Sequence, residues 1–233
     1  MKMKVSTIVI IAVTIIFLYL AGKFGFTIIS IEAAEETVQN EAFDPLEYVE
    51  GIWDSQMIPA FETNSVNLAT ILSEVKPNAD GTATKDQLIT IAEKYGLITV
   101  GEAHVYMVKG SGMITAVDTE SSLGTAELKL DGYDGPITTR IYIGPRIPSD
   151  ETSVRDAVGF ISFGDFKEQT EYGKVASEIN KYVLANSLAE LDLEKLIGKS
   201  ISFKGAFTIR TFNLVQIDMS DIRVVPVEVD LGE

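Results

Sequence analysis

The sequence contains no cysteine and only one histidine, and these two absences exclude much of the usual chemistry of protein sites. Without cysteine the chain has no disulfide, no thiolate nucleophile and no thioether-linked lipid. A zinc site of thiolates and imidazoles lacks its ligands for the same reason. The one histidine, His104, lies in an expected strand, which predicts an ordinary strand residue and not a general base. We therefore expect no catalytic residue, no metal and no cofactor.

Carboxylates remain as a means of binding calcium or hydrolysing a bond, but no recognisable motif contains them. Asp131 and Asp134 lie in a glycine-rich turn that lacks the spacing of a calcium loop. The Gly110–Gly112 segment lacks the Gly-Lys-Ser/Thr of a phosphate loop. The chain has 34 acidic residues, and none of them stands out as a pair for glycoside hydrolysis. We predict a protein that is not an enzyme, with a carboxylate-based hydrolase as an alternative.

The N-terminal segment has no acidic residue before Glu32 and contains an apolar run, Val5–Gly22. As a helix, this run would be about 27 Å long, close to the hydrocarbon thickness of a bilayer. Lys2 and Lys4 precede it, so the positive-inside bias exports the rest of the chain. We predict a transmembrane anchor at residues 1–31, with a cleaved signal segment as the alternative, and a linker at residues 32–42. The expected location is the cell membrane, single-pass, with the C-terminal domain on the extracytoplasmic (periplasmic) side.

Charge excludes one class of partner. The chain has 19 basic and 34 acidic residues, and three of the basic ones precede Glu32. The exported part therefore has 16 basic and 34 acidic residues, a net charge of −18. Such a surface repels phosphate backbones, so we expect no nucleic-acid partner.

Helical signals dominate residues 43–96, which we predict to form a small helical domain. Asp44 can cap a helix that begins at Pro45, and Thr84 with Gln87 forms a capping-box pattern. Pro59 should end or kink the first helix. Apolar residues recur at helical spacing on each segment.

Strand signals dominate residues 97–233. Ala103–Lys109 and Met113–Asp118 read as two strands joined by a turn at Gly110–Gly112, and Ile137–Ile143 alternates as a strand does. A helix is predicted from about Glu168 to Leu188, and Pro226 predicts an edge or a bulge in the last strand. We predict an α+β fold whose second domain is a small, partly open barrel, similar to oligonucleotide/oligosaccharide-binding (OB) folds, with an inserted long helix.

Trp53 and Asp54 are the candidate ligand-binding residues. An indole ring beside a carboxylate suits a sugar, because the ring can stack on a pyranose face while the carboxylate accepts hydrogen bonds from hydroxyl groups. The alternative places Trp53 in the core, on the apolar face of the first helix, with Asp54 in solvent.

Several short motifs, in this order, resemble a bacterial family described as predicted periplasmic lipoproteins of unknown function (domain of unknown function 2291). The resemblance covers roughly residues 43–229 and rests on Phe43-Asp44-Pro45, Ile52-Trp53-Asp54-Ser55, Val108-Lys109-Gly110-Ser111-Gly112, Ile143-Gly144-Pro145, Phe160-Ile161-Ser162-Phe163 and Phe203-Lys204-Gly205-Ala206-Phe207. It implies a helical domain followed by a barrel, and an exported protein often encoded beside sugar-type ABC transporters. It implies no catalytic residue. The lipobox cysteine is missing, since Lys23 follows Leu20-Ala21-Gly22.

Three functions follow as expectations. The first is a membrane-anchored, non-enzymatic accessory of a small-molecule (sugar-type) ABC uptake system, with transporter components as partners. The second is a module that binds a sugar or oligosaccharide directly. The third is the hydrolase. A concave site with exposed aromatic side chains would favour the second.

Overall fold

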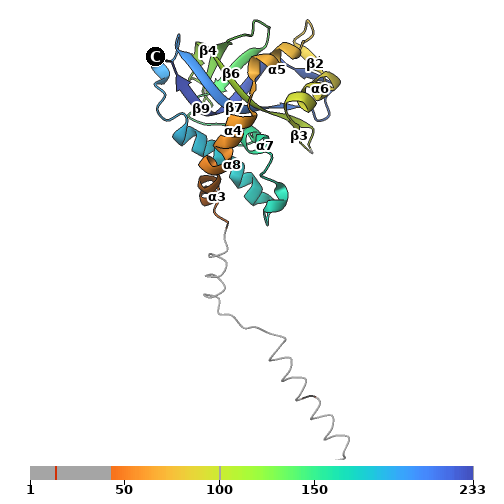
Figure 1. Ribbon diagram of the computed structural model, residues 1–233, viewed down its shortest axis with the longest axis vertical. Helices are drawn as coiled ribbons and strands as arrows, with labels where there is room; N and C mark the ends of the chain where they lie inside the picture. The colour runs from red at the N-terminus through yellow and green to blue at the C-terminus, as the bar shows by residue number, and fades with distance from the viewer. Residues whose placement is uncertain (1–13, 15–42, 100, 233) are drawn as a thin grey trace, which may run out of the picture. The chain divides into compact units, whose positions relative to one another are not determined.

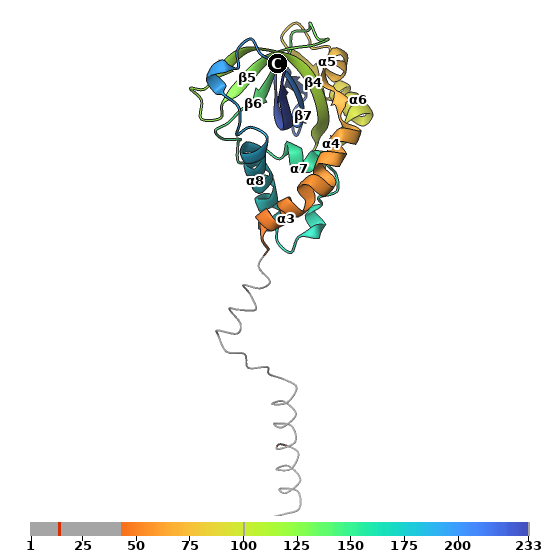
Figure 2. The ribbon, with the colours of Figure 1, turned by 60° about the vertical axis from the view of Figure 1, so that its left-hand side comes forward.

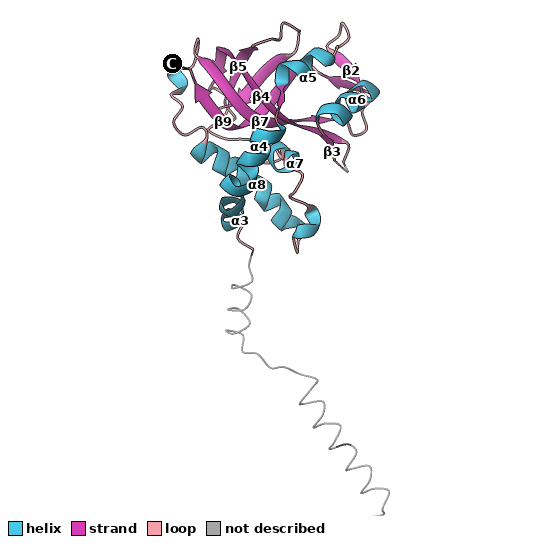
Figure 3. Cartoon of the chain, viewed as in Figure 1, coloured by secondary structure: helices cyan, strands magenta, loops and turns pink. Residues whose placement is uncertain are grey.

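Five strands pair edge to edge in a ring (Figures 1 and 3). The computed structural model describes residues 14, 43–99 and 101–232. The antiparallel pairs are β4–β5, β5–β6, β4–β7 and β7–β9, and a parallel pair, β6–β9, closes the ring. The predicted α+β class is confirmed, with the long helix between β6 and β7. The five strands are β4 (Ala103–Asp118), β5 (Thr125–Leu130), β6 (Thr138–Tyr142), β7 (Ser200–Arg210) and β9 (Asp221–Leu231).

Alternate positions of these strands fill the interior of the barrel, as the period of two requires. Tyr106 of β4 and Phe207 of β7 stack there, with ring centroids 4.8 Å apart. Both rings are buried, together with Ile141 of β6 and Val224 of β9. The opposite positions of the strands therefore face outward, and they are available to form the site described below.

The turn predicted at Gly110–Gly112 is wrong, because β4 runs through it without interruption. The glycines permit close packing instead of a turn. A Cβ atom on Gly112 would lie 2.4 Å from the carbonyl oxygen of Lys129, and one on Gly110 would lie 2.9 Å from the ring of Phe203. The bulge predicted at Pro226 is confirmed: the register of β7 and β9 shifts there, between Lys204 and Gly205.

The first helical segment contains a π-helical turn. Asp44 caps α3 (Pro45–Ile52) by accepting a hydrogen bond from the N–H of Leu46 at 2.9 Å. The π-helical turn, Trp53–Met57, follows at once and leads into α4 (Ile58–Asn64). Pro59, expected to end or kink the helix, lies in the first turn of α4. Pro59 has no backbone N–H to donate. The π-helical turn just before it accommodates this missing donor, and the segment therefore stays helical.

Short strands connect the remainder of residues 43–96 with the β-rich part. β1 (Val66–Asn67) pairs with β4 of the barrel, whereas β2 (Thr82–Thr84) forms a separate two-stranded sheet with β8 (Gln216–Asp218). Contacts group Asp44–Glu233 into one compact unit. The division into 43–96 and 97–233 therefore separates a helical part and a β-rich part of a single unit. The other elements here are α5 (Leu68–Glu74), α6 (Lys85–Tyr95), capped by Thr84 as predicted, and β3 (Leu97–Ile98), which pairs with β4.

The long helix α8 (Gln169–Asn186) lies beside α3 at one end of the barrel, next to the short α7 (Ser153–Ala157) (Figure 2). Trp53 packs against Tyr182 of α8 with ring centroids 4.7 Å apart. The predicted anchor (1–31) and linker (32–42) lie outside the described residues, apart from Thr14. Among the described helices, none is both long enough and apolar enough to span a bilayer.

Candidate ligand-binding cleft

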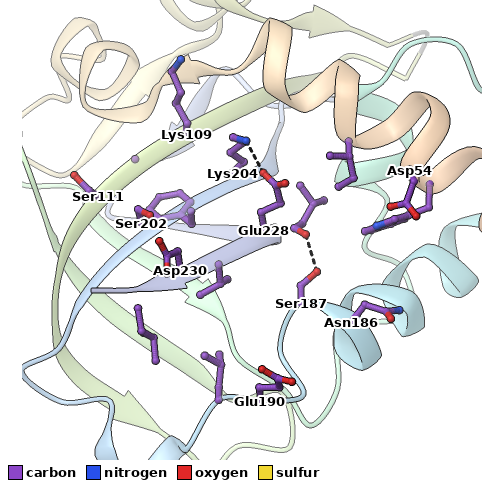
Figure 4. Close-up of a pocket in the computed structure, with 18 of the residues that line it drawn as sticks. Asp54, Lys109, Ser111, Asn186, Ser187, Glu190, Ser202, Lys204, Glu228 and Asp230 are labelled. Carbon is purple, nitrogen blue, oxygen red and sulfur yellow. Dashed lines mark hydrogen bonds and ion pairs between the residues drawn. The ribbon is translucent and has the colours of Figure 1, made fainter. Parts of the chain in front are cut away.

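A cleft of about 1060 Å³ lies between two walls. The strand wall is the outer face of β4, β7 and β9, and the helix wall is formed by the π-helical turn, α4 and the end of α8 with the residues that follow it. Figure 4 shows its polar side chains on strands and helices facing a common space. The residues come from segments that are far apart in sequence and that only the fold brings together. The polar residues of the lining are Asp54, Asn67, Lys109, Ser111, Asn186, Ser187, Glu190, Ser202, Lys204, Glu228 and Asp230.

The strand wall carries two rows of polar side chains that cross three strands. In the first row, Lys109 pairs with Lys204, which pairs with Glu228. In the second, Ser111 pairs with Ser202, which pairs with Asp230. Since directly opposed side chains on one face lie about 4.5–5.5 Å apart, each row presents a continuous line of hydrogen-bonding groups to the cleft.

A bulge in β9 connects the strand wall to the helix wall. The shift in register leaves Val227 opposite no residue of β7. Its carbonyl oxygen accepts a hydrogen bond of 2.6 Å from the hydroxyl of Ser187, which caps α8. Bulges are common beside functional sites because they redirect a strand, and this one holds the end of α8 against the cleft.

The helix wall contains both residues predicted from the sequence. The Trp53 side chain is buried, its residue only 5% exposed, whereas Asp54 is exposed. Both line the cleft, and both belong to the π-helical turn, a rare geometry that is frequent at functional sites. The ring of Trp53 packs on Tyr182, so it contributes a wall and not an open stacking face.

The charges of the cleft are mostly negative, since four carboxylates and two lysines line it. The ammonium group of Lys204 is 2.6 Å from the carboxylate of Glu228 and 3.9 Å from that of Glu62. Within the described part of the chain, no ion pair involves Asp54, Glu190 or Asp230. The excess negative charge therefore favours neutral or cationic ligands over anions.

Sequence reasoning singled out Trp53 and Asp54, which line the cleft, but it did not point to the strand wall. The alternation Val227-Glu228-Val229-Asp230-Leu231 was a signal, because it places two acids on one face of the last strand. Nothing local predicted that Lys204 of β7 and Glu190 after α8 would face the same space.

The face of the barrel that OB folds use for binding lies elsewhere, on β5 and β6. Here an ion-pair network covers it: Arg140 contacts Asp221 and, at 3.0 Å, Glu127, while Arg223 is 3.0 Å from Asp221. The depression at this face is only about 320 Å³. The larger cleft is thus the better candidate.

Other acids considered from the sequence have local partners. Asp131 accepts a hydrogen bond from the Ser111 hydroxyl at 2.7 Å, and Asp218 accepts one from the N–H of Ser220 at 2.8 Å. Among the described residues, no group of three or more histidine and acidic side chains is placed to hold a metal ion.

His104 lies in β4 and is 1% exposed. Its Nε2 atom is 3.4 Å from the Thr211 hydroxyl, and it does not line the cleft. Burial lowers the pKa of His104 below its usual value, the charge of Lys85 lowers that pKa further, and Glu102 opposes both. Folding therefore favours the neutral ring. This contribution to stability is present above the unfolded-state pKa of about 6.5 and is lost as the pH falls below it.

We expect the substitution His104→Gln to leave ligand binding and its pH profile unchanged, because the ring does not line the cleft and contacts the Thr211 hydroxyl, not a carboxylate. Binding should be measured between pH 5.5 and 8, beside unfolding curves that report the fold. A variant that folds normally but loses binding or a measurable turnover would contradict this prediction.

Comparisons with known proteins agree with this architecture. The model of a family described as predicted periplasmic lipoprotein (DUF2291) matches residues 13–230. The crystal structure of an OB-fold protein from Thermotoga maritima, at 16% sequence identity, superposes with a TM-score of 0.61 and covers 82% of this chain and all of the other. This likeness supports the OB-like barrel. A search of curated proteins finds no match.

Proposed function

The chain belongs to the family of predicted periplasmic lipoproteins, and we propose that it is a non-enzymatic extracytoplasmic binding module. Its ligand site is the cleft between the strand wall and the helix wall. The observation that carries this proposal is the cleft itself, whose volume of about 1060 Å³ is at the upper end of ordinary ligand sites. Its two rows of polar side chains supply the convergent donors and acceptors that orient a ligand.

A binding role fits the cleft better than a hydrolytic one. A carboxyl group that serves as general acid near neutral pH must be shielded from water to stay protonated. Asp54, Glu190 and Asp230 are exposed instead. We therefore retain the expectation that the chain is not an enzyme.

The expected setting, as an accessory of a sugar-type ABC uptake system, remains part of this proposal. The family resemblance motivates it, and a module that works by binding suits it. Direct binding of a sugar is the alternative. It is less favoured, because the aromatic residues that line the described cleft, Trp53 and Phe203, are both buried and offer no open ring face for stacking.

Co-purification tests the proposal. The full chain should be isolated from detergent-solubilised membranes, and bound proteins and small molecules identified by mass spectrometry. We expect Ser202→Trp, which fills the cleft, to lose the bound species. Thr115→Trp, at an exposed position of β4 outside the cleft, is the control and should keep them. Retention by both variants, or release of a hydrolysed product, would overturn the proposal.

The proposed anchor makes a separate prediction about the N-terminus. We expect the mature protein to stay in the membrane fraction after high-salt and alkaline washes, because an apolar span of this length is held by the bilayer and not by charge. Substitutions at Gly22 and Lys23 should not affect processing, since no cysteine follows Gly22. A mature N-terminus near Ala34, found by N-terminal sequencing, would show a cleaved signal peptide instead.

A further inference from the structure

The second half of β9 has a strand partner on one side only. Residues Asp221–Val224 pair with β6, and residues Val225–Leu231 pair with β7. Among the described residues, no strand pairs with the other edge of Val225–Leu231. β4 differs, because β3, β1 and β5 in turn cover the edge that faces away from β7.

The pairing with β7 shows which backbone groups face this open edge. Gly232 donates its N–H to the carbonyl of Ser200 at 3.0 Å, which makes them a hydrogen-bonded pair. Such pairs alternate along an antiparallel ladder. Val229 and Leu231 therefore turn their N–H and C=O groups away from β7. Val227 fits the same alternation, since its carbonyl faces outward and accepts the hydrogen bond from Ser187.

This open edge borders the cleft, because Val227–Leu231 all line it. The five residues extend over roughly 15 Å at about 3.4 Å per residue. Val229 and Leu231 offer two donors and two acceptors at a spacing of two residues. A further strand can hydrogen-bond to these backbone groups. The N–H and C=O groups on one edge of that strand also recur every two residues.

The charges beside the edge favour a basic occupant. Asp230 is on β9 itself, and Glu190 and Ser187 follow from the end of α8 on the facing side (Figure 4). The lysine of the strand wall nearest this edge, Lys204, is already paired with Glu228. Lys109 lies two strands away, on β4.

From these observations we infer that the cleft binds an extended polypeptide segment, which adds to β9 as a further strand and places a lysine or arginine side chain beside Asp230 and Glu190. This inference rests on the proposed function and names the occupant of the same site. The main chain of the segment bonds Val229 and Leu231, and the carboxylates select its basic side chain.

A selection from a phage-displayed library of random heptapeptides tests the inference, with the full chain immobilised in detergent. We expect enrichment of sequences that carry lysine or arginine among β-branched residues. The selected peptide should bind wild type at least tenfold more tightly than Asp230→Lys. Thr115→Lys, which adds the same charge outside the cleft, should change affinity less than twofold.

N-methylation of the selected peptide tests strand addition without altering the protein. Methyl groups on one alternate set of amides should weaken binding at least tenfold, because those N–H groups bond β9. Methyl groups on the intervening set should change it less than twofold. Equal effects of both sets, or no enriched sequence, would overturn the inference. If the cleft then proved to hold a sugar or another small molecule, the proposed function would stand, whereas an empty cleft in every assay would overturn both.

Discussion

The substitution Trp53→Ala should lower the free energy of unfolding by about 3–5 kcal/mol, the usual cost of removing a large buried aromatic side chain. The indole is buried where the π-helical turn meets α8, and its ring packs on Tyr182. Its loss would leave a cavity between two helices that both form a wall of the cleft. Urea unfolding of the wild type and the variant measures the difference.

Asp54→Ala is the matched control, because Asp54 follows Trp53 directly and its side chain is exposed. Its stability should stay within about 0.5 kcal/mol of the wild type. If Trp53→Ala kept full stability and lost only ligand binding, Trp53 would be a stacking platform and the core interpretation would be wrong.

A second large effect is expected from Gly124→Ala, in the turn between β4 and β5. Gly124 has φ +50°, and an added Cβ would lie 1.7 Å from the carbonyl oxygen of Gly144. That oxygen belongs to the backbone, so one of the two segments must move. The movement would strain the hydrogen bond from the N–H of Ile143 to the carbonyl of Gly124. We expect a loss of at least about 3 kcal/mol, since a positive φ and a steric clash act together.

Gly132→Ala separates these two contributions. Gly132 also has a positive φ, +78°, but its added Cβ would meet only the Cβ of Ala69 at 3.7 Å. Its cost should be about 1–2 kcal/mol, from backbone conformation alone. Equal losses in the two variants, measured by the same unfolding experiment, would show that the contact with Gly144 is not what constrains Gly124.

Local signals predicted much of the fold. The cap residues Asp44 and Thr84 begin helices, and the helix expected from about Glu168 to Leu188 is α8, Gln169–Asn186. These predictions succeed because capping and helical periodicity depend on residues within one or two turns. The turn predicted at Gly110–Gly112 was wrong, because these glycines pack closely on Lys129 and Phe203. Those contacts come from residues distant in sequence, so a local pattern does not reveal them.

The candidate site was harder to predict than the fold. Asp54 comes from the first helical segment, Glu190 from the segment after α8 and Asp230 from the last strand. The register of β7 and β9 turns Asp230 toward the cleft, and the packing of α8 beside the first helical segment brings Asp54 and Glu190 to it. Register depends on pairing over the whole barrel, which no short window of sequence contains.

Site-specific photo-cross-linking tests most directly the claim that the cleft is the binding site. A benzophenone amino acid should replace Asn186, an exposed residue in the lining of the cleft, or Val215, an exposed residue outside it. After irradiation in intact cells, mass spectrometry identifies any adduct. We predict one defined adduct at position 186 that is absent at position 215. No adduct at position 186, or the same adducts at both positions, would contradict the assignment of the cleft as the binding site.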